Sequence, residues 1–312
     1  MHFNKILITG AAGFIGSHVF DHFSNLYPDA EITILDKMTY AANTKNIPSI
    51  ETKSHHNLVI GDLIDLDICL DTTKDKDLVI NLAAESHVDN SFNNSIIFSR
   101  SNALGTHTLM EACKQNNVKK ILHVSTDEVY GENIDKPFLE DDRLNPTNPY
   151  SASKAAAEMI VKSYHTSFKL PVIVVRANNI YGIRQFPEKL ISTSILSLIK
   201  NKKIPLHGNG KNIRYYLSAT DFANALIKIV TKKNKGIFNV GSNFYERNIN
   251  IAKLICKFFN KDPNKHIQFT KDRLYNDKRY SVSSKKVRRL GWKPQKKLTE
   301  DLPQIIDWYK KN

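Results

Sequence analysis

Short apolar runs alternate with longer stretches of helical periodicity over the first 180 residues. Runs rich in β-branched residues predict strands at 6–9, 32–36, 58–60, 78–81, 121–125 and 172–176. Between them, apolar positions recur every three or four residues over 16–26, 102–115 and 151–168, which predicts amphipathic helices. This alternation predicts a parallel sheet flanked by helices, with ligands at the carboxyl ends of its strands.

The pattern loosens after residue 176, where loops with proline and glycine separate short helices. Residues 219–231 and 237–240 still predict a helix and a strand that return to the sheet. We therefore expect a sheet domain of residues 1–181 and about 219–241. Residues 182–218 and 242–312 should form a smaller, discontinuous substrate-binding lobe, with the binding cleft between the two parts.

Composition indicates a globular protein of a reducing compartment. The chain has 312 residues, of which 41% are hydrophobic, and only three cysteines at wide spacing. We expect no metal site built on cysteine. Because no apolar run approaches about 18 residues and the chain passes directly into a strand pattern, we also expect no membrane span, no leader and a cytoplasmic location.

Charge divides the chain into two unlike halves. Residues 1–150 contain 12 basic and 21 acidic residues, a net charge of −9, whereas residues 151–312 carry +23. A basic second half suits an anionic ligand. It lacks interleaved aromatic residues and any nucleic-acid motif, so we expect no nucleic-acid partner. A solvated surface without a partner is the alternative for most of these lysines.

A glycine-rich turn follows the first predicted strand. The segment Gly10-Ala-Ala-Gly13-Phe-Ile-Gly16 lets the chain turn sharply, approach a pyrophosphate closely and start a tightly packed helix. Asp36 lies 20 residues beyond Gly16, at the end of the second strand, where its carboxylate can accept hydrogen bonds from a ribose. The context predicts a Rossmann-like, doubly wound NAD-binding domain.

Two acidic positions bear on the cofactor differently. The Asp36 carboxylate would repel a 2′-phosphate, which favours NAD over NADP, although Lys37 beside it weakens that exclusion. Asp62 ends the third predicted strand. It either contacts the adenine edge or is an ordinary turn residue, and the sequence leaves both open.

Two groups of reactive side chains follow. Tyr150 and Lys154 are four residues apart at the start of a predicted helix and therefore share a face. We expect the ammonium group to lower the pKa of the tyrosine, so that it can act as a base. Thr126, Asp127 and Glu128 end the predicted strand 121–125, where catalytic groups project in this fold; a polar turn is the alternative.

These motifs together resemble the nucleotide-sugar 4,6-dehydratases of the extended short-chain dehydrogenase/reductase superfamily. The resemblance covers nearly the whole chain and is strongest with the dehydratase domain of plant UDP-rhamnose synthases. Its segments are 10–16, 36–37, 82–89, 125–131, 146–154, 185–190 and 276–280, and residues 88–92 and 178–182 favour the plant domain.

The resemblance implies a three-step reaction on a nucleoside diphosphate glucose. Tyr150, with Thr126 on the same oxygen and Lys154 nearby, would take the C4 hydroxyl proton as hydride passes to NAD. Glu128 would then remove the C5 proton while Asp127 protonates the departing C6 hydroxyl, and the hydride would return to C6. Because consecutive strand residues point to opposite faces, we expect the backbone at Asp127 and Glu128 to leave regular strand geometry.

The resemblance also places the ligands. We expect NAD to contact Gly10, Gly13, Phe14, Ile15, Gly16, Asp36, Lys37, Asp62, Leu63, Leu82, Ala83, Ala84, Ser101, Ser125, Tyr150 and Lys154. We expect the substrate to contact Ser86, Thr126, Asn179, Lys189, Leu190, His207, Arg214, Arg273 and Asn276. Arg214 and Arg273 are the expected diphosphate contacts, because a guanidinium group offers paired donors to phosphate oxygens.

Several alternatives stay open. UDP-glucose is the preferred substrate on motif similarity, with dTDP-glucose as the alternative. A nucleotide-sugar 4-epimerase would need Tyr150, Lys154 and NAD but has no use for Asp127 and Glu128. A non-catalytic NAD-binding or nucleic-acid-binding protein would not need the five side chains Thr126, Asp127, Glu128, Tyr150 and Lys154. The resemblance also implies a homodimer formed through the helices 102–115 and 151–168.

Overall fold

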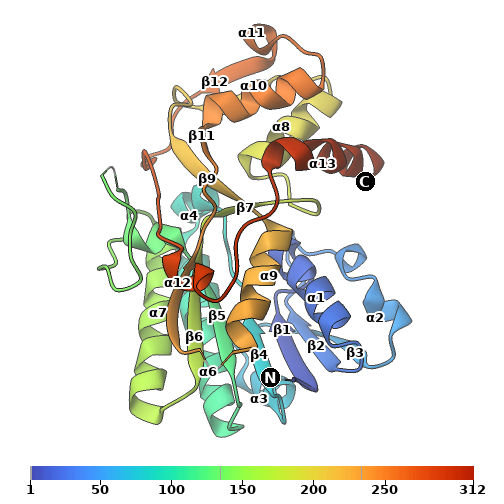
Figure 1. Cartoon of the computed structure of the whole chain (residues 1–312), viewed down its shortest axis with the longest axis vertical. Coiled ribbons are helices and arrows are strands. Elements are labelled where there is room, and N and C mark those ends of the chain that lie inside the picture. The colour runs from blue at the N-terminus through green and yellow to red at the C-terminus, as the bar shows by residue number, and fades with distance from the viewer. Residues whose placement is uncertain (1, 134, 233) are drawn as a thin grey trace.

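A seven-stranded parallel sheet forms the centre of the lower part of the protein (Figure 1). The structure is a computed structural model that describes residues 2–133, 135–232 and 234–312. In spatial order the strands are β10 (Gly236–Val240), β6 (Val172–Ala177), β5 (Ile121–Thr126), β4 (Leu78–Asn81), β1 (Lys5–Thr9), β2 (Glu31–Asp36) and β3 (His56–Ile60). The predicted doubly wound α/β fold is confirmed.

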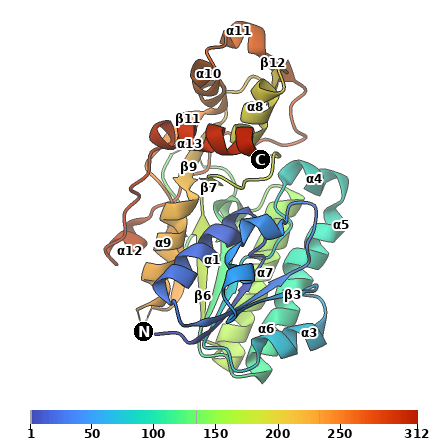
Figure 2. The same ribbon diagram turned by 90° about the vertical axis from the view of Figure 1, so that its right-hand side faces the viewer.

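Helices cover both faces of this sheet (Figures 1 and 2). On one face, the apolar side of α1 (Phe14–Leu26) and that of α9 (Ala219–Val230) share a hydrophobic cluster with the strands. A second hydrophobic cluster lies on the other face, where apolar side chains are buried from α3 (Leu66–Thr73), α6 (Gly105–Gln115) and α7 (Pro149–Phe168). Strands buried on both sides explain the nearly continuous apolar runs in the sequence.

The strand order reverses between β1 and β4, which both pair with neighbours in parallel register. The chain winds from β1 outward to β3 on one side and from β4 outward to β10 on the other. Such a reversal leaves a crevice at the carboxyl ends of the two central strands. The glycine turn follows β1 at this edge.

The upper lobe has its own hydrophobic cluster, in which Ile195, Ile251 and Ile305 are buried together. It contains α8 (Leu190–Ile199), α10 (Asn248–Phe258), α11 (Pro263–His266), α13 (Leu298–Lys311), β7 (Asn179–Tyr181), β8 (Ile204–His207), β9 (Ile213–Ser218), β11 (Tyr245–Arg247) and β12 (Ile267–Thr270). Between β12 and α13 the chain runs back down through α12 (Lys285–Arg288) (Figure 1). Trp292, in this segment, packs into the hydrophobic cluster of β1.

Short helices complete the structure around the sheet. They are η1 (Thr44–Asn46), α2 (Ser49–Thr52), α4 (Val88–Asn93), α5 (Ser95–Phe98), the π-helical η2 (Ser99–Leu104) and the 3-10 helix η3 (Asp127–Tyr130). Within the three described ranges, no helix has both the length and the apolar character that crossing a membrane requires.

Candidate active site

A cavity of about 700 Å³ lies at the carboxyl edge of the sheet and reaches into the upper lobe. Its lining includes every residue that the sequence assigned to cofactor, substrate or chemistry. Residues from the turn after β1 to the segment before α12 therefore meet in one space. Which of these residues contact the cofactor and which contact the substrate stays a prediction.

The glycine turn has no room for side chains at two of its positions. A Cβ atom on Gly16 would lie 2.1 Å from the carbonyl oxygen of Gly10, and one on Gly10, whose φ is +72°, would lie 2.7 Å from the backbone of Ala83. No side chain of the described residues caps α1, and its first residues Phe14, Ile15 and Gly16 line the cavity. This arrangement fits the pyrophosphate of a dinucleotide.

Asp36 is held in place by the backbone on both sides. Its Oδ2 accepts a hydrogen bond from the amide of Ala12 at 3.0 Å, and its Oδ1 accepts one from Met38 at 2.9 Å. Burial raises the pKa of this carboxyl above its ordinary value, and the two amides partly offset that shift. A carboxylate has further lone pairs, so it can still receive the hydroxyls of a ribose.

Lys37 does not remain free to attract a 2′-phosphate. Its Nζ lies 2.7 Å from Oδ2 of Asp62, on the neighbouring strand end. Asp62 also accepts the amide of Ile64 at 3.3 Å, as a turn residue does, while it lines the cavity. The bond to Ile64 fits the turn interpretation of Asp62, and its contact with the adenine edge stays a prediction.

Backbone geometry changes where the catalytic cluster begins. β5 ends at Thr126, and η3 starts with Asp127, so the backbone leaves strand geometry as predicted. The Thr126 hydroxyl accepts the amide of Glu128 at 3.2 Å and thereby caps this short helix. Both acidic side chains are buried and line the same cavity.

Neighbouring amides hold the two carboxyl groups. Asn178 Nδ2 donates to Asp127 Oδ2 at 2.6 Å, and Asn148 Nδ2 donates to Glu128 Oε2 at 3.4 Å. Burial and the adjacent charge of Glu128 raise the pKa of Asp127 from 3.8 to about 7. Asp127 can therefore keep a proton near neutral pH, which an acid that works beside a base requires.

The expected lowering of the Tyr150 pKa is wrong for this structure. Burial, followed by the charge of Glu128, raises the pKa of this phenol, and a hydrogen bond with Thr126 offsets only part of the effect. Lys154 Nζ donates to the carbonyl oxygen of Val124 at 2.8 Å, and burial lowers the pKa of this amine to about 8. Tyr150 therefore rests in its protonated form.

A buried ion pair fixes α7 against the sheet. The Arg176 guanidinium on β6 contacts both carboxylate oxygens of Glu158 on α7, with an Nη2 to Oε2 distance of 2.6 Å. Both side chains are at most 3% exposed. The guanidinium also lies 4.5 Å from the ring centre of Tyr130, which ends η3. The pair thus joins the helix of Tyr150 to the segment of Asp127.

Basic side chains lie at the far end of the cavity. Arg273 pairs with Asp89, with an Nε to Oδ1 distance of 2.7 Å. Arg214 donates to the carbonyl oxygens of Ile213 and Asp277, each at 2.9 Å. Because these contacts fix both guanidinium groups at the cavity wall, they can receive an anionic ligand such as a diphosphate.

Contacts across the cavity mouth connect the two parts of the protein. Tyr40, after β2, donates to Glu188 Oε2 at 3.1 Å and meets the ring of Phe186 edge-on at 5.1 Å. Lys189 Nζ donates to the carbonyl oxygen of Ser86 at 3.2 Å. All five of these residues line the cavity.

Sequence reasoning missed two residues of this site. Asn178 bonds Asp127 directly, and Tyr280 lines the cavity beneath Arg214. Both lie inside segments that carried the family resemblance, so position within those segments was an available signal. Ser125 Oγ is also buried without a hydrogen-bond partner among the described residues, which leaves it available to a ligand.

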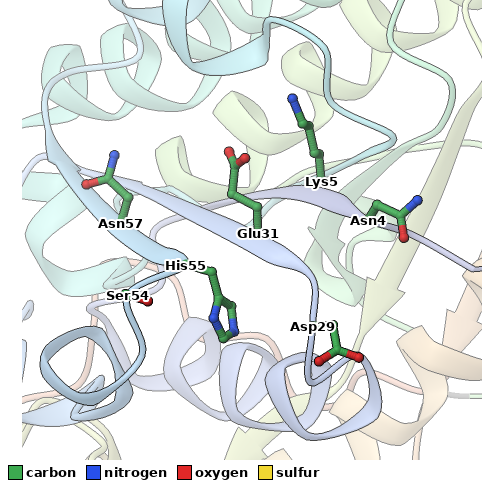
Figure 3. Close-up of a pocket in the computed structure, with 7 residues that line it drawn as sticks. All are labelled: Asn4, Lys5, Asp29, Glu31, Ser54, His55 and Asn57. Carbon is green, nitrogen blue, oxygen red and sulfur yellow. The ribbon is translucent and has the colours of Figure 1, made fainter.

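A second hollow, of about 460 Å³, lies at the amino ends of β1, β2 and β3 (Figure 3). It is lined by Asn4, Lys5, Asp29, Glu31, Ser54, His55 and Asn57, none of which belongs to the predicted site. In the described chain, no group of three or more His, Cys, Asp or Glu side chains is arranged to hold a metal ion. The candidate chemistry therefore lies in the larger cavity.

Comparisons with known proteins agree with this geometry. The family model described as GDP-mannose 4,6 dehydratase matches residues 7–305. A trifunctional UDP-glucose 4,6-dehydratase/UDP-4-keto-6-deoxy-D-glucose 3,5-epimerase/UDP-4-keto-L-rhamnose-reductase of Arabidopsis thaliana is 44% identical over 99% of this chain. The chain spans about half of that relative, 47% of its length.

Two further proteins extend the comparison. A dTDP-D-glucose 4,6-dehydratase of Dictyostelium discoideum is 40% identical over 99% of this chain and 82% of its own. The crystal structure of a dTDP-glucose 4,6-dehydratase from Streptomyces venezuelae, with NAD bound, superposes with a TM-score of 0.95 at 32% identity. That match covers 99% of this chain and 97% of the other.

Proposed function

The chain belongs to the GDP-mannose 4,6-dehydratase family, and on that premise we propose that it catalyses the NAD-dependent 4,6-dehydration of UDP-glucose. The product is UDP-4-keto-6-deoxyglucose. One observation carries the proposal: Asp127 and Glu128 are buried side by side, in the cavity that also contains Tyr150 and the glycine turn.

The first step is oxidation at C4 of the glucose. NAD, when bound, supplies a hydride acceptor at the start of the cycle and a donor at its end. Tyr150 takes the proton of the C4 hydroxyl, and Thr126 hydrogen-bonds the same oxygen. Because the resting phenol is protonated, it must release that proton to solvent before it can take one from the substrate, and the positive charge of Lys154 on the same face of α7 favours the resulting phenolate.

The second step is loss of water. A ketone at C4 makes the C5 proton acidic, and Glu128 removes that proton while Asp127 gives its own to the departing C6 hydroxyl. A C5–C6 double bond forms as water leaves. Hydride then adds to C6, and Glu128 returns its proton to C5. The proton that Tyr150 took from the C4 hydroxyl balances the one that Asp127 gave, so the net change is the loss of one water.

The preference for UDP rests on similarity to the plant dehydratase domain, and a dTDP-glucose substrate is the alternative that the Dictyostelium relative supports. The test is to incubate the protein with UDP-glucose, dTDP-glucose and GDP-mannose separately and to compare kcat/KM. We expect loss of one water without net NADH, and the highest kcat/KM with UDP-glucose. A higher value with dTDP-glucose would refute the nucleotide preference and leave the dehydratase proposal standing.

A 4-epimerase is the second candidate reaction, since it uses Tyr150 and NAD in the same way. It has no use for Asp127 and Glu128, and its product has the mass of its substrate. Deuterium placed on C4 of the sugar distinguishes the two: dehydration should carry it to the C6 methyl group. We further expect Asp127→Asn to slow elimination far more than C4 oxidation, and equal slowing of both steps would remove Asp127 from the role of acid.

We also propose that the protein forms a homodimer through α6 and α7. On α7, Met159 is 49% exposed and Phe168, the last residue of the helix, is 54% exposed, so both apolar side chains are open to a second chain. Light scattering should give twice the mass of the chain. Met159→Lys together with Phe168→Lys should shift that mass to the monomer value.

A further inference from the structure

Asp277 is a buried carboxylate behind the wall of the cavity, 2% exposed. Its two oxygens accept the hydroxyl of Thr147 at 3.0 and 3.1 Å, and Oδ2 also accepts the hydroxyl of Tyr280. A buried carboxylate is costly unless such donors surround it. Asp277 therefore joins two segments that lie 130 residues apart in the chain.

On one side of Asp277 lies the arginine expected to meet the diphosphate. The Tyr280 ring lies beneath the Arg214 guanidinium, with 4.8 Å between the Cζ atom and the ring centre. The carbonyl oxygen of Asp277 accepts Arg214 Nη1 at 2.9 Å, and Asn276 Oδ1 accepts Nη2 at 3.0 Å. The segment that contains Asp277 thus sets the orientation of Arg214.

On the other side lies the start of the catalytic helix. Thr147 directly precedes Asn148, whose Oδ1 accepts the amide of Ser151 at 2.9 Å and so caps α7. The same Asn148 donates to Glu128, and Tyr150 is the second residue of the helix. A shift of Thr147 would therefore move both the cap and the groups that it supports.

We propose that Asp277 is a positioning residue that couples nucleotide binding to the catalytic helix. This inference rests on the proposed function. Binding of the diphosphate at Arg214 is transmitted through Tyr280, Asp277 and Thr147 to the first turn of α7, where it holds Tyr150 for reaction. Binding energy from a remote part of a substrate can be used in this way to orient the reacting groups.

Two substitutions separate the halves of this connection. Thr147→Val removes the hydroxyl on the catalytic side; we expect kcat to fall at least about tenfold, while the calorimetric Kd for UDP stays within about twofold. Thr147→Ser restores the hydroxyl and should restore most of kcat. Tyr280→Phe removes the hydroxyl on the nucleotide side and should raise the Kd for UDP about fivefold.

Tyr275→Phe is the matched control. Tyr275 lies in the same segment as Tyr280, but it is 44% exposed and its hydroxyl lies 3.5 Å from Glu132. We expect this variant to keep the wild-type kcat and Kd for UDP. If Thr147→Val keeps the wild-type kcat, or loses UDP affinity in the same proportion as kcat, Asp277 has no coupling role.

Hydrogen exchange provides a readout that does not depend on turnover. UDP should slow amide exchange in the first turn of α7 in the wild-type protein, and this protection should be absent in Thr147→Val. If the wild-type protein releases no water from any of the three sugar nucleotides, the proposed function fails, and the exchange data alone then decide whether Asp277 couples. UDP-dependent protection that persists in Thr147→Val overturns the coupling.

Discussion

The buried carboxyl of Asp127 should make the stability of the protein depend on pH in a way that one substitution removes. Its pKa is raised from 3.8 to about 7 in the folded chain by burial and by the charge of Glu128. In the unfolded chain the group is expected to titrate near 3.8. Between these two values the folded state keeps a proton that the unfolded state releases. The free energy of unfolding therefore falls as pH rises from about 4 to about 7, and it stays lowered above that.

The size of this effect follows from the shift. Each pKa unit corresponds to about 1.36 kcal/mol, so the full shift costs about 4 kcal/mol of stability once Asp127 is ionised. Between pH 5 and pH 8, about 3 kcal/mol of this loss should be observed. Asp127→Asn has no proton to lose there, and its amide can still meet Asn178 and Thr126.

Urea unfolding of the ligand-free protein at pH 5, 6, 7 and 8 measures this difference. We expect the wild-type protein to lose about 3 kcal/mol relative to Asp127→Asn across that range, so that the variant gains relative stability as it loses turnover. Asp307→Asn, at an exposed position of α13, is the control and should follow the wild-type curve. Parallel curves for the wild type and Asp127→Asn would refute the reasoning.

Three further predictions concern the parts around this group. Gly16→Ala places a Cβ atom against the backbone of the preceding turn and should lower the free energy of unfolding in urea by at least about 3 kcal/mol. For Gly13→Ala, the nearest atom lies 3.4 Å from the added Cβ, and the free energy of unfolding should fall by less than about 1 kcal/mol. Tyr150→Phe should reduce kcat by at least about 100-fold and leave the calorimetric Kd for UDP within about threefold. Glu158→Leu leaves the buried Arg176 guanidinium without its carboxylate partner and should lower the free energy of unfolding by about 3–5 kcal/mol. Adding Arg176→Met should recover most of this loss. An equal or greater loss in the double variant would contradict this reasoning.

The sequence predicted the sheet well because its signals are local. Each predicted strand of the sheet lies within an observed strand, and the glycine turn starts a helix as expected. The departure from strand geometry at Asp127 was also predictable, because two adjacent side chains can reach one space only if the backbone turns.

What sequence could not predict arises from contacts between distant segments. The pKa of Tyr150 rises because of burial and the charge of Glu128, and this burial comes in part from Val88 and Phe98, which lie far away along the chain. Asn178 and Asp277 matter through bonds to residues 51 and 130 positions away, respectively. No spacing within a motif encodes such distances.

The Arg176–Glu158 pair also has a consequence for how this chain can vary over generations. Neither side chain contacts the cavity, yet replacing either one alone leaves its partner charged and enclosed by protein. A substitution at one position is therefore tolerated only in a background where the other has already changed. We expect related sequences either to keep both charged residues or to replace both of them.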